Sequence, residues 1–431
     1  MRSLIESFRK DGEVLDVKKE VSVTYEIPYY LKKNEEKIVF FENVKSYGIK
    51  VVGNICSTRE RITKALNIEK NSLVEHLLNA FDSPKKVKIV KKGPIKDIVK
   101  EEVDIENLPI LRHYEKDGGH FITAGIVVAK DPDTGVRNAS IHRLMRLGKD
   151  KLGIRIVPRH LYKIFNENKK DGRSTEIAII IGAHPALLLA ASSSIPYEID
   201  ELEVANRLHE FKCIKCNTVD LEVPDQAEIV LEGRILNDKK HAEGPLVDIT
   251  GTYDIVRDEP VVELTCLMHR KEPIYQAILP GGREHQLLMG LPQEPRILKA
   301  VRNITPNVKG IRLTEGGCHW FHAVISIEKQ SEGDGKNVIL AALSAHPSLK
   351  HVVVVDEDID IFDDKMIEYA MATRVKGDED IYIFPKIRGS SLDPTGDQVT
   401  SLVTKVGIDA TKSFSIPPER FEIARIPWSE D

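Results

Sequence analysis

The chain has 431 residues, of which 41% are hydrophobic and 30% charged, so it can bury several cores and is not a disordered protein. Its 62 basic and 67 acidic residues give a formal net charge of -5, which argues against a general binder of nucleic-acid backbones. The five cysteines lack the pattern of a disulfide framework, and the sequence shows neither a membrane-spanning apolar run nor a signal peptide. Together these features predict a soluble, cytoplasmic protein.

Residues 1–105 are strongly charged, and their apolar spacing alternates between helical and extended patterns. Leu4, Ile5 and Phe8 indicate an opening helix. Further helices are expected over 59–68 and 72–81, and strands over 37–44 and 49–55. This first region is therefore predicted to be a small α/β unit.

Residues 106–294 begin with a Pro- and Gly-containing segment and are then rich in strands. Strands are expected over 122–131, 139–148, 152–158, 176–182, 227–235 and 260–269, and a helix is expected from Pro185, since proline suits a first helical turn. Many strands with few helices predict a sandwich or a barrel.

Residues 295–431 alternate helices with buried strands, which predicts a parallel-type α/β domain. Helices are expected over 295–304, 335–349 and 366–375, and strands over 322–329, 351–360 and 380–385. The tail after residue 390 has few periodic runs, and whether it packs on its own chain or on a neighbouring subunit stays open.

The common nucleotide and hydrolase motifs are absent from the sequence. Cys213 and Cys216 form a single CxxC pair without the second pair that a structural zinc site needs, so two partly buried thiols are the favoured interpretation. The acidic run 356–360 follows a strand, and a solvated loop or a helix start explains it better than a cation site does.

Polar side chains concentrate in four segments of the central region: 137–143, 155–160, 243–248 and 281–285. In the first of them, strand alternation places Asn138, Ser140 and His142 on one face and Arg143 on the other. Asparagine, histidine and glutamate side chains together suit manganese or magnesium. Each segment alone is more often a turn or a surface pair.

Several motifs in order over residues 100–412 resemble the UbiD-like decarboxylases, which use prenylated FMN. These are NLPILRHYEKDGGHF, CNTVDLEVPDQAEIVLEGRI with AEGPLVDITGTY, VVVVDEDIDIFD and KVGIDATK. The resemblance implies an N-terminal α/β region (1–105), a central FMN-binding split β-barrel (106–294) and a C-terminal α/β domain with its tail (295–431). It also implies a homo-oligomer.

The resemblance assigns metal-binding and cofactor-binding residues. By motif, the ligands of a manganese or magnesium ion fall on Asn138, His160 and Glu243, and potassium is a further implied ion. The residues implied to contact prenylated FMN are Ile141, His142, Arg143, Arg155, Ile156, Val157 and Lys405.

Arg143 and Glu284 are the implied catalytic residues. Arg143 would bind the substrate carboxylate, and Glu284 would deliver a proton to the carbon that loses carbon dioxide. Here GGREH replaces the GRPPDE-like segment of many members, and no second acid coupled to Arg143 can be placed from the sequence.

Within this family, the short chain without the longer insertions of aromatic-acid members, together with its archaeal-looking composition, resembles members that act on a phosphorylated, unsaturated carboxylic acid. The substrate that this resemblance implies is trans-anhydromevalonate 5-phosphate, converted to isopentenyl phosphate in the modified mevalonate pathway. Cations that could bind its phosphate are His142, Arg159, Arg283 and His285, each with a structural alternative. A flavin prenyltransferase would supply the cofactor. The alternatives are a 4-hydroxybenzoate-type polyprenyl decarboxylase of quinone biosynthesis and a non-catalytic flavin-binding scaffold.

Overall fold

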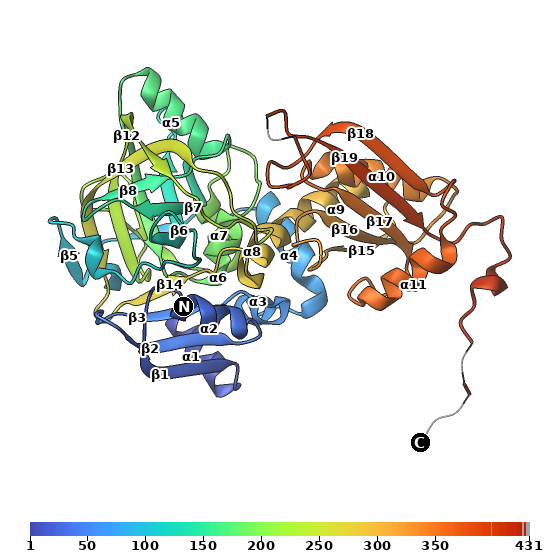
Figure 1. Cartoon of the computed structure of the whole chain (residues 1–431), viewed down its shortest axis with the longest axis horizontal. Helices are drawn as coiled ribbons and strands as arrows, with labels where there is room; N and C mark the ends of the chain where they lie inside the picture. Colours follow the sequence, from blue (N-terminus) through green and yellow to red (C-terminus); the bar gives the residue numbers. More distant parts are fainter. Residues whose placement is uncertain (398, 425, 428–431) are drawn as a thin grey trace. The chain divides into compact units, whose positions relative to one another are not determined.

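The computed structural model describes residues 1–397, 399–424 and 426–427, which form two compact units, Met1–Pro292 and Gln293–Asp431 (Figure 1). The helices of the first unit are α1 Arg2–Lys10, α2 Glu26–Lys33, α3 Arg59–Leu66, α4 Leu73–Asp82, α5 His160–Lys170, α6 Pro185–Ala191, α7 Glu201–Leu208 and α8 Arg283–Gly290. Its first strands are β1 Val14–Val21, β2 Ile38–Val44, β3 Lys50–Gly53, β4 Lys88–Val90, β5 Ile98–Lys100, β6 Phe121–Lys130 and β7 Arg137–Arg146. Its later strands are β8 Lys151–Ile154, β9 Thr175–Ile181, β10 Lys212–Lys215, β11 Glu222–Pro224, β12 Ile229–Glu243, β13 Arg257–His269 and β14 Ile274–Ala277.

The N-terminal region contains a four-stranded mixed sheet in the order β1-β2-β3-β14. Its last strand comes from the far end of the unit and pairs in parallel with β3. Apolar residues of β2 and β3, including Phe40 and Val52, pack against Ile5 and Phe8 of α1 in one buried cluster. The α/β character expected for this region is therefore confirmed.

The centre of the first unit is a closed barrel of six antiparallel strands, in the order β12-β9-β6-β7-β8-β13, with β13 pairing back to β12. Alternate side chains of each strand enter different cores: Ile179 and Leu231 belong to one buried cluster, and Ile180 and Val230 to another. The second cluster also contains the fully apolar helix α6. Burial on both faces explains why residues 177–181 of β9 and the start of β12 are continuously apolar rather than alternating.

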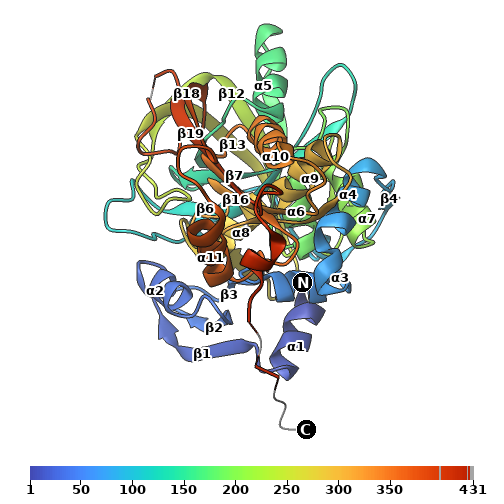
Figure 2. The same cartoon turned by 90° about the vertical axis from the view of Figure 1, so that its right-hand side faces the viewer.

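Three helices of the central region were not among the expected elements: α5, α7 and α8. In Figures 1 and 2, α5 projects beyond the barrel on the side of β12. Helix α7 begins after Asp200, whose side chain accepts a hydrogen bond from the Leu202 N–H and so caps the helix. The three missed helices, α5, α7 and α8, have 11, 8 and 8 residues, so each offers only a few turns of apolar spacing.

The second unit consists of α9 Glu294–Arg302, β15 Val308–Leu313, β16 His322–Ile327, α10 Asp334–Ala345, β17 His351–Asp356, α11 Asp364–Arg374, β18 Ile381–Arg388 and β19 Leu402–Ala410. Its sheet has the order β15-β16-β17-β19-β18. The three central strands are parallel, but both edge strands are antiparallel, so the sheet is mixed rather than wholly parallel. On β19, Gly407 faces Ile339 of α10, whereas Ala410 packs in the cluster of α11, so the two helices cover opposite faces.

Candidate functional site

Arg143 lies on β7 among three carboxylates. Its Nε and Nη2 donate to Oε1 and Oε2 of Glu243 at 2.9 and 2.8 Å, forming a bidentate pair with a fully buried acid. Its Nη1 lies 3.1 Å from Asp254 Oδ2 and 4.0 Å from Asp248 Oδ2. Both aspartates belong to the loop that connects β12 to β13. Burial would raise the pKa of Asp254, but the hydrogen bond from Arg257 and the charge of Arg143 hold this pKa below its usual value.

The turn after β12 positions Glu243. Gly244 has a φ of +98°, which suits glycine, and it is followed by Pro245 in a cis peptide. Gly118 packs directly on this turn, since a Cβ at Gly118 would lie 2.0 Å from the Gly244 carbonyl oxygen. The Gly118 N–H also donates to the Pro245 carbonyl at 2.9 Å. The missing side chain at Gly118 therefore lets two backbone segments approach each other beside Arg143.

Asn138 and His160 are brought together by a residue that the sequence did not single out, Glu201. The Asn138 Nδ2 donates to Glu201 Oε1 at 3.0 Å, and the His160 Nδ1 lies 3.6 Å from the same oxygen. The other oxygen accepts the Ala139 N–H at 2.8 Å. Asn138 is the second residue of β7, and His160 and Glu201 are the first residues of α5 and α7, so the starts of three elements meet here.

His142 is buried, and its contacts fix its tautomer. Its Nδ1 lies 2.8 Å from the Arg155 carbonyl oxygen, which only accepts, so Nδ1 carries the proton. Its Nε2 then accepts from Ser140 Oγ at 2.9 Å. Burial lowers the His142 pKa to about 4, so the ring is neutral near pH 7. A neutral ring does not supply the phosphate-binding cation considered from the sequence. The Arg155 side chain forms an ion pair with Glu259.

The three apolar residues expected at the cofactor differ in exposure. Ile141 is half-buried against the cluster that contains helix α6. Ile156 is buried in the other cluster, the one that contains Ile179 and Leu231. Val157 is 39% exposed in the loop before α5. Ile156 therefore has a core role whatever else it contacts, and Val157 is the most available of the three to a bound molecule.

Lys405 belongs to the second unit, on β19. Its side chain is buried, and its Nζ donates to the Pro347 carbonyl oxygen at 2.6 Å. Burial lowers its pKa to about 8. A buried lysine bonded to a neutral carbonyl retains donors for an anion.

Glu284 is not in a polar turn, as the sequence suggested, but in the first turn of α8, where it is 1% exposed. Its two oxygens accept the backbone N–H groups of Asn54 and Cys56 at 2.8 and 2.7 Å. Burial raises its pKa from 4.5 to about 7, against the opposing effect of these donors and of Arg61. A carboxyl with such a pKa exchanges its proton near neutral pH.

The next residue, His285, accepts the Gly281 N–H on Nδ1 at 3.0 Å. Burial lowers its pKa, the charge of Asp248 opposes this, and Arg143 lowers it further. His285 is therefore electrostatically linked to the Arg143 cluster. Arg283, by contrast, forms an ion pair with Glu36 of the N-terminal region.

The Asn138 amide oxygen has the chemistry of a ligand for a divalent ion. Ser140 Oγ lies within hydrogen-bond distance of both His142 Nε2 and Asn138 Oδ1, at 2.9 and 3.2 Å, but a hydroxyl has one proton. The His142 tautomer requires that proton, which leaves the buried Asn138 oxygen as an acceptor. Across the described residues, no group of three His, Cys, Asp or Glu side chains is placed as a metal site.

Cys213 of the cysteine pair lies within electrostatic reach of Arg137 and Asp200, the neighbours of Asn138 and Glu201. Cys213 on β10 and Cys216 just after it are buried free thiols. Burial raises the pKa of Cys213 to about 12, so this sulfur is not an activated thiolate.

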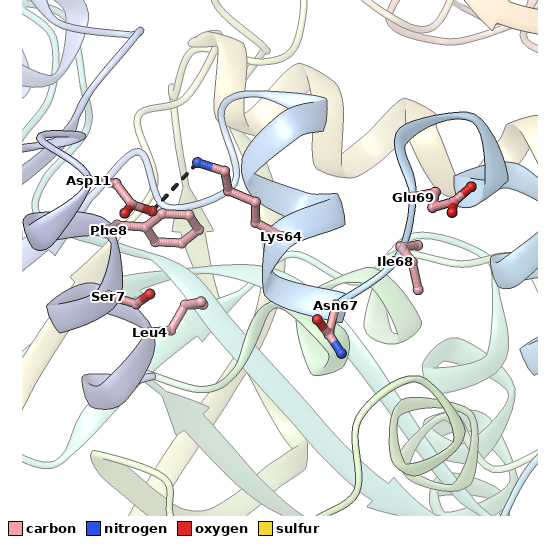
Figure 3. Close-up of a pocket in the computed structure, with 8 residues that line it drawn as sticks. All are labelled: Leu4, Ser7, Phe8, Asp11, Lys64, Asn67, Ile68 and Glu69. Atoms are coloured by element: carbon pink, nitrogen blue, oxygen red, sulfur yellow. Dashed lines mark ion pairs between the residues drawn. The ribbon is translucent and has the colours of Figure 1, made fainter.

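A surface groove of about 530 Å³ lies between α1 and the end of α3 (Figure 3). Leu4 and Phe8 line one side, and Lys64, which forms an ion pair with Asp11 at 3.6 Å, lines the other. It contains none of the residues expected at the active site, and we assign no function to it.

Three family models match consecutive parts of the chain. They are described as the N-terminal, Rift-related and C-terminal domains of 3-octaprenyl-4-hydroxybenzoate carboxy-lyase, over residues 5–81, 87–283 and 286–410. The chain belongs to the UbiD family and is a carboxy-lyase by that membership.

Among its relatives, the anhydromevalonate phosphate decarboxylase of Methanothermobacter thermautotrophicus is 52% identical over 97% of this chain and 98% of that protein. The enzyme of the same name from Methanocaldococcus jannaschii is 50% identical over 92% of this chain and 94% of its own length. A solved structure of the UbiD-class enzyme HmfF from Pelotomaculum thermopropionicum, in complex with FMN, has a TM-score of 0.97 and 41% identity, covering 99% of this chain and 97% of that one. A second HmfF structure, an evolved dimeric form, is in complex with prFMN. In the part of our chain that the structure describes, no helix combines the length and apolarity needed to cross a bilayer.

Sequence reasoning missed Glu201 and Asp254, and it gave Asp248, at the end of the polar segment 243–248, no role beside Arg143. A signal for α7 was present, since Asp200 with Glu203 three residues later is the pattern of a capped helix start. The role of Glu201 itself depends on a partner 63 residues away, and local spacing does not reveal such a pair.

Proposed function

We propose that this protein decarboxylates trans-anhydromevalonate 5-phosphate to isopentenyl phosphate and carbon dioxide, with prenylated FMN as cofactor. The observation that carries the proposal is that five archaeal relatives, 40–52% identical over 85–99% of this chain, are named anhydromevalonate phosphate decarboxylase. The arginine, the buried acid and the donor set described above supply groups that such a reaction needs.

Prenylated FMN, when bound, would accept the electron density that the departing carbon dioxide leaves behind, which no side chain does well. Asn138, His160 and Glu243 would hold a divalent ion, manganese or magnesium, beside the cofactor phosphate. Lys405 stays a candidate for contact with the cofactor. Glu243 would then divide its oxygens between the ion and Arg143, with which it now forms a bidentate pair.

Arg143 would bind the substrate carboxylate through its planar donor edge. Glu243 occupies the Nε–Nη2 edge, so the substrate would take the Nη1–Nη2 edge, near which Asp254 lies at 3.1 Å. Asp254 and Asp248 are our candidates for the second acid coupled to Arg143. Their negative charges keep the guanidinium oriented but compete with the substrate for it.

Glu284 would deliver the proton to the carbon that has lost carbon dioxide. Its raised pKa of about 7 supports this role, because a substantial fraction stays protonated at neutral pH. Its hydrogen bonds to Asn54 and Cys56 hold the acid at the N-terminal region, so delivery to a substrate at Arg143 requires a change of rotamer. His285, beside the Arg143 cluster, is the alternative donor.

Four further expectations belong to this proposal: supply of the cofactor by a flavin prenyltransferase, assembly into a homo-oligomer, a cytoplasmic location and potassium as an additional ion. Arg159 and Arg283 are our candidates for binding the substrate phosphate. We also keep the division into regions 1–105, 106–294 and 295–431.

Co-expression with a flavin prenyltransferase tests the proposal. The purified protein should carry a modified flavin and manganese, and it should release carbon dioxide from trans-anhydromevalonate 5-phosphate but not from a polyprenyl hydroxybenzoate. The reverse preference would favour the quinone-type decarboxylase, and a protein without flavin or metal would favour a scaffold.

A further inference from the structure

Glu201 is almost completely buried, with 3% of its surface exposed, and three protein donors surround its two oxygens. Oε1 accepts the Asn138 amide and faces the His160 Nδ1, and Oε2 accepts the Ala139 N–H. A carboxylate accepts on both oxygens, whereas a glutamine of the same shape accepts on only one. The contacts therefore suit a side chain with two acceptor oxygens, which a glutamate has and a glutamine lacks.

These contacts orient the Asn138 and His160 side chains so that the acceptor atom of each points away from Glu201. Because the Asn138 Nδ2 points at Glu201, its Oδ1 points away from this acid, and the Ser140 proton is already engaged with His142. Because the His160 Nδ1 faces Glu201, its Nε2 is turned to the other side of the ring. An amide oxygen and an imidazole nitrogen with free lone pairs are what a divalent ion needs.

Two further contacts limit the movement of this group. The Tyr197 ring packs edge-on against His160, with centroids 5.2 Å apart and an interplanar angle of 87°, and Lys163 Nζ lies 3.7 Å from the Tyr197 centroid. The residue before Asn138, Arg137, pairs with the residue before Glu201, Asp200, at 2.6 Å. The start of α7 is thus fixed to the start of β7 at two adjacent positions.

We propose that Glu201 is the positioning residue of the metal site: it holds Asn138 and His160 with their acceptor atoms facing the ion and does not bind the ion itself. The inference rests on the proposed function, because Asn138 and His160 are metal ligands only there. A carboxylate behind a metal-binding histidine typically changes metal affinity by about 10- to 100-fold when it is removed.

The test uses holoenzyme purified after co-expression with a flavin prenyltransferase. Manganese and flavin per chain are measured for wild type, Glu201→Gln and Glu201→Asp, together with the rate at which a chelator removes manganese, followed by electron paramagnetic resonance. The aspartate variant keeps the charge, but its side chain is one methylene too short to reach all three donors. Glu203→Gln is the matched control, because it removes the same charge from the same helix without a side-chain contact to the site. Asp200→Asn loosens the helix start through the neighbouring pair instead.

Both Glu201 variants should lose manganese at least about tenfold faster than wild type, with flavin retention falling in parallel, while Glu203→Gln behaves as wild type. Asp200→Asn should lower the melting temperature but change manganese loss less than Glu201→Gln does. Wild-type manganese retention in Glu201→Gln would overturn the positioning role alone, as would equal loss in Asp200→Asn. A wild-type holoenzyme that contains flavin but no divalent ion would overturn the role and the proposed metal site together.

Discussion

Replacing Glu284 by glutamine should change both the rate of the reaction and the way stability depends on pH. Moving the pKa of Glu284 from 4.5 to about 7 costs its ionised form about 3 kcal/mol, at about 1.4 kcal/mol for each tenfold change in the ionisation constant. The folded protein thus holds this proton more tightly than the unfolded chain does. The contribution of Glu284 to stability is fully present below pH 4.5 and is lost as the pH rises through about 7.

A glutamine does not titrate, so its contribution to stability does not depend on pH. It has only one acceptor oxygen for the two N–H groups of Asn54 and Cys56. Leaving one of these donors unpaired costs about 1–3 kcal/mol at every pH. Glu284→Gln should therefore be less stable than wild type at pH 5. The difference in free energy of unfolding between the two proteins should shift in favour of the variant by about 2–3 kcal/mol between pH 5 and pH 8.

The assay combines melting temperatures from pH 5 to pH 8 with infrared difference spectra. Wild type should show a protonated carboxyl band that disappears with a midpoint near pH 7, and the variant should lack this band. Turnover of the variant holoenzyme should fall at least about a hundredfold. A stability difference independent of pH, without the band, would refute the raised pKa, and near-normal turnover would refute the role of Glu284 as proton donor and direct the search to His285.

Three further changes test the rest of the site. Arg143→Lys should slow the holoenzyme strongly, because an ammonium cannot reproduce the bidentate contact with Glu243, and steady-state kinetics will measure the loss; turnover close to wild type would remove Arg143 from catalysis. Glu243→Gln should lower manganese and flavin content together in metal analysis and absorbance spectra, whereas unchanged contents would exclude it as a ligand. Cys213→Ser with Cys216→Ser should leave metal content and activity near wild type, and loss of a stoichiometric zinc would contradict that expectation.

The sequence predicted most elements whose apolar pattern is long. The strands around Val127 and Val353 and the helix around Val338 are buried on regular periods, so burial and periodicity agree. Helix α7 was missed although its start carries a capping pattern, because its eight residues give only about two turns of apolar spacing. Strand β19 lies in the tail after residue 390, where the sequence shows few periodic runs. The sequence does not predict this strand, because it is placed by its pairing with β17 and β18.

The sequence predicted only those residues of the candidate site that lie in recognisable motifs. Asn138 and His160 do share one partner, but that partner, Glu201, lies on a separate helix. The surroundings of Glu284 could not be predicted, because its hydrogen-bond donors are backbone groups 228 and 230 residues away that carry no side-chain signature. Contacts of this kind depend on tertiary packing rather than on local spacing.

The central claim is that this chain carries out a non-oxidative decarboxylation that ends in protonation. The most direct test incubates holoenzyme with carboxyl-labelled trans-anhydromevalonate 5-phosphate in heavy water and measures labelled carbon dioxide and the product together. Our account predicts equal amounts of labelled carbon dioxide and isopentenyl phosphate, with one solvent deuterium on the carbon that lost the carboxylate. Absence of labelled carbon dioxide from a protein that retains its modified flavin and metal would contradict it.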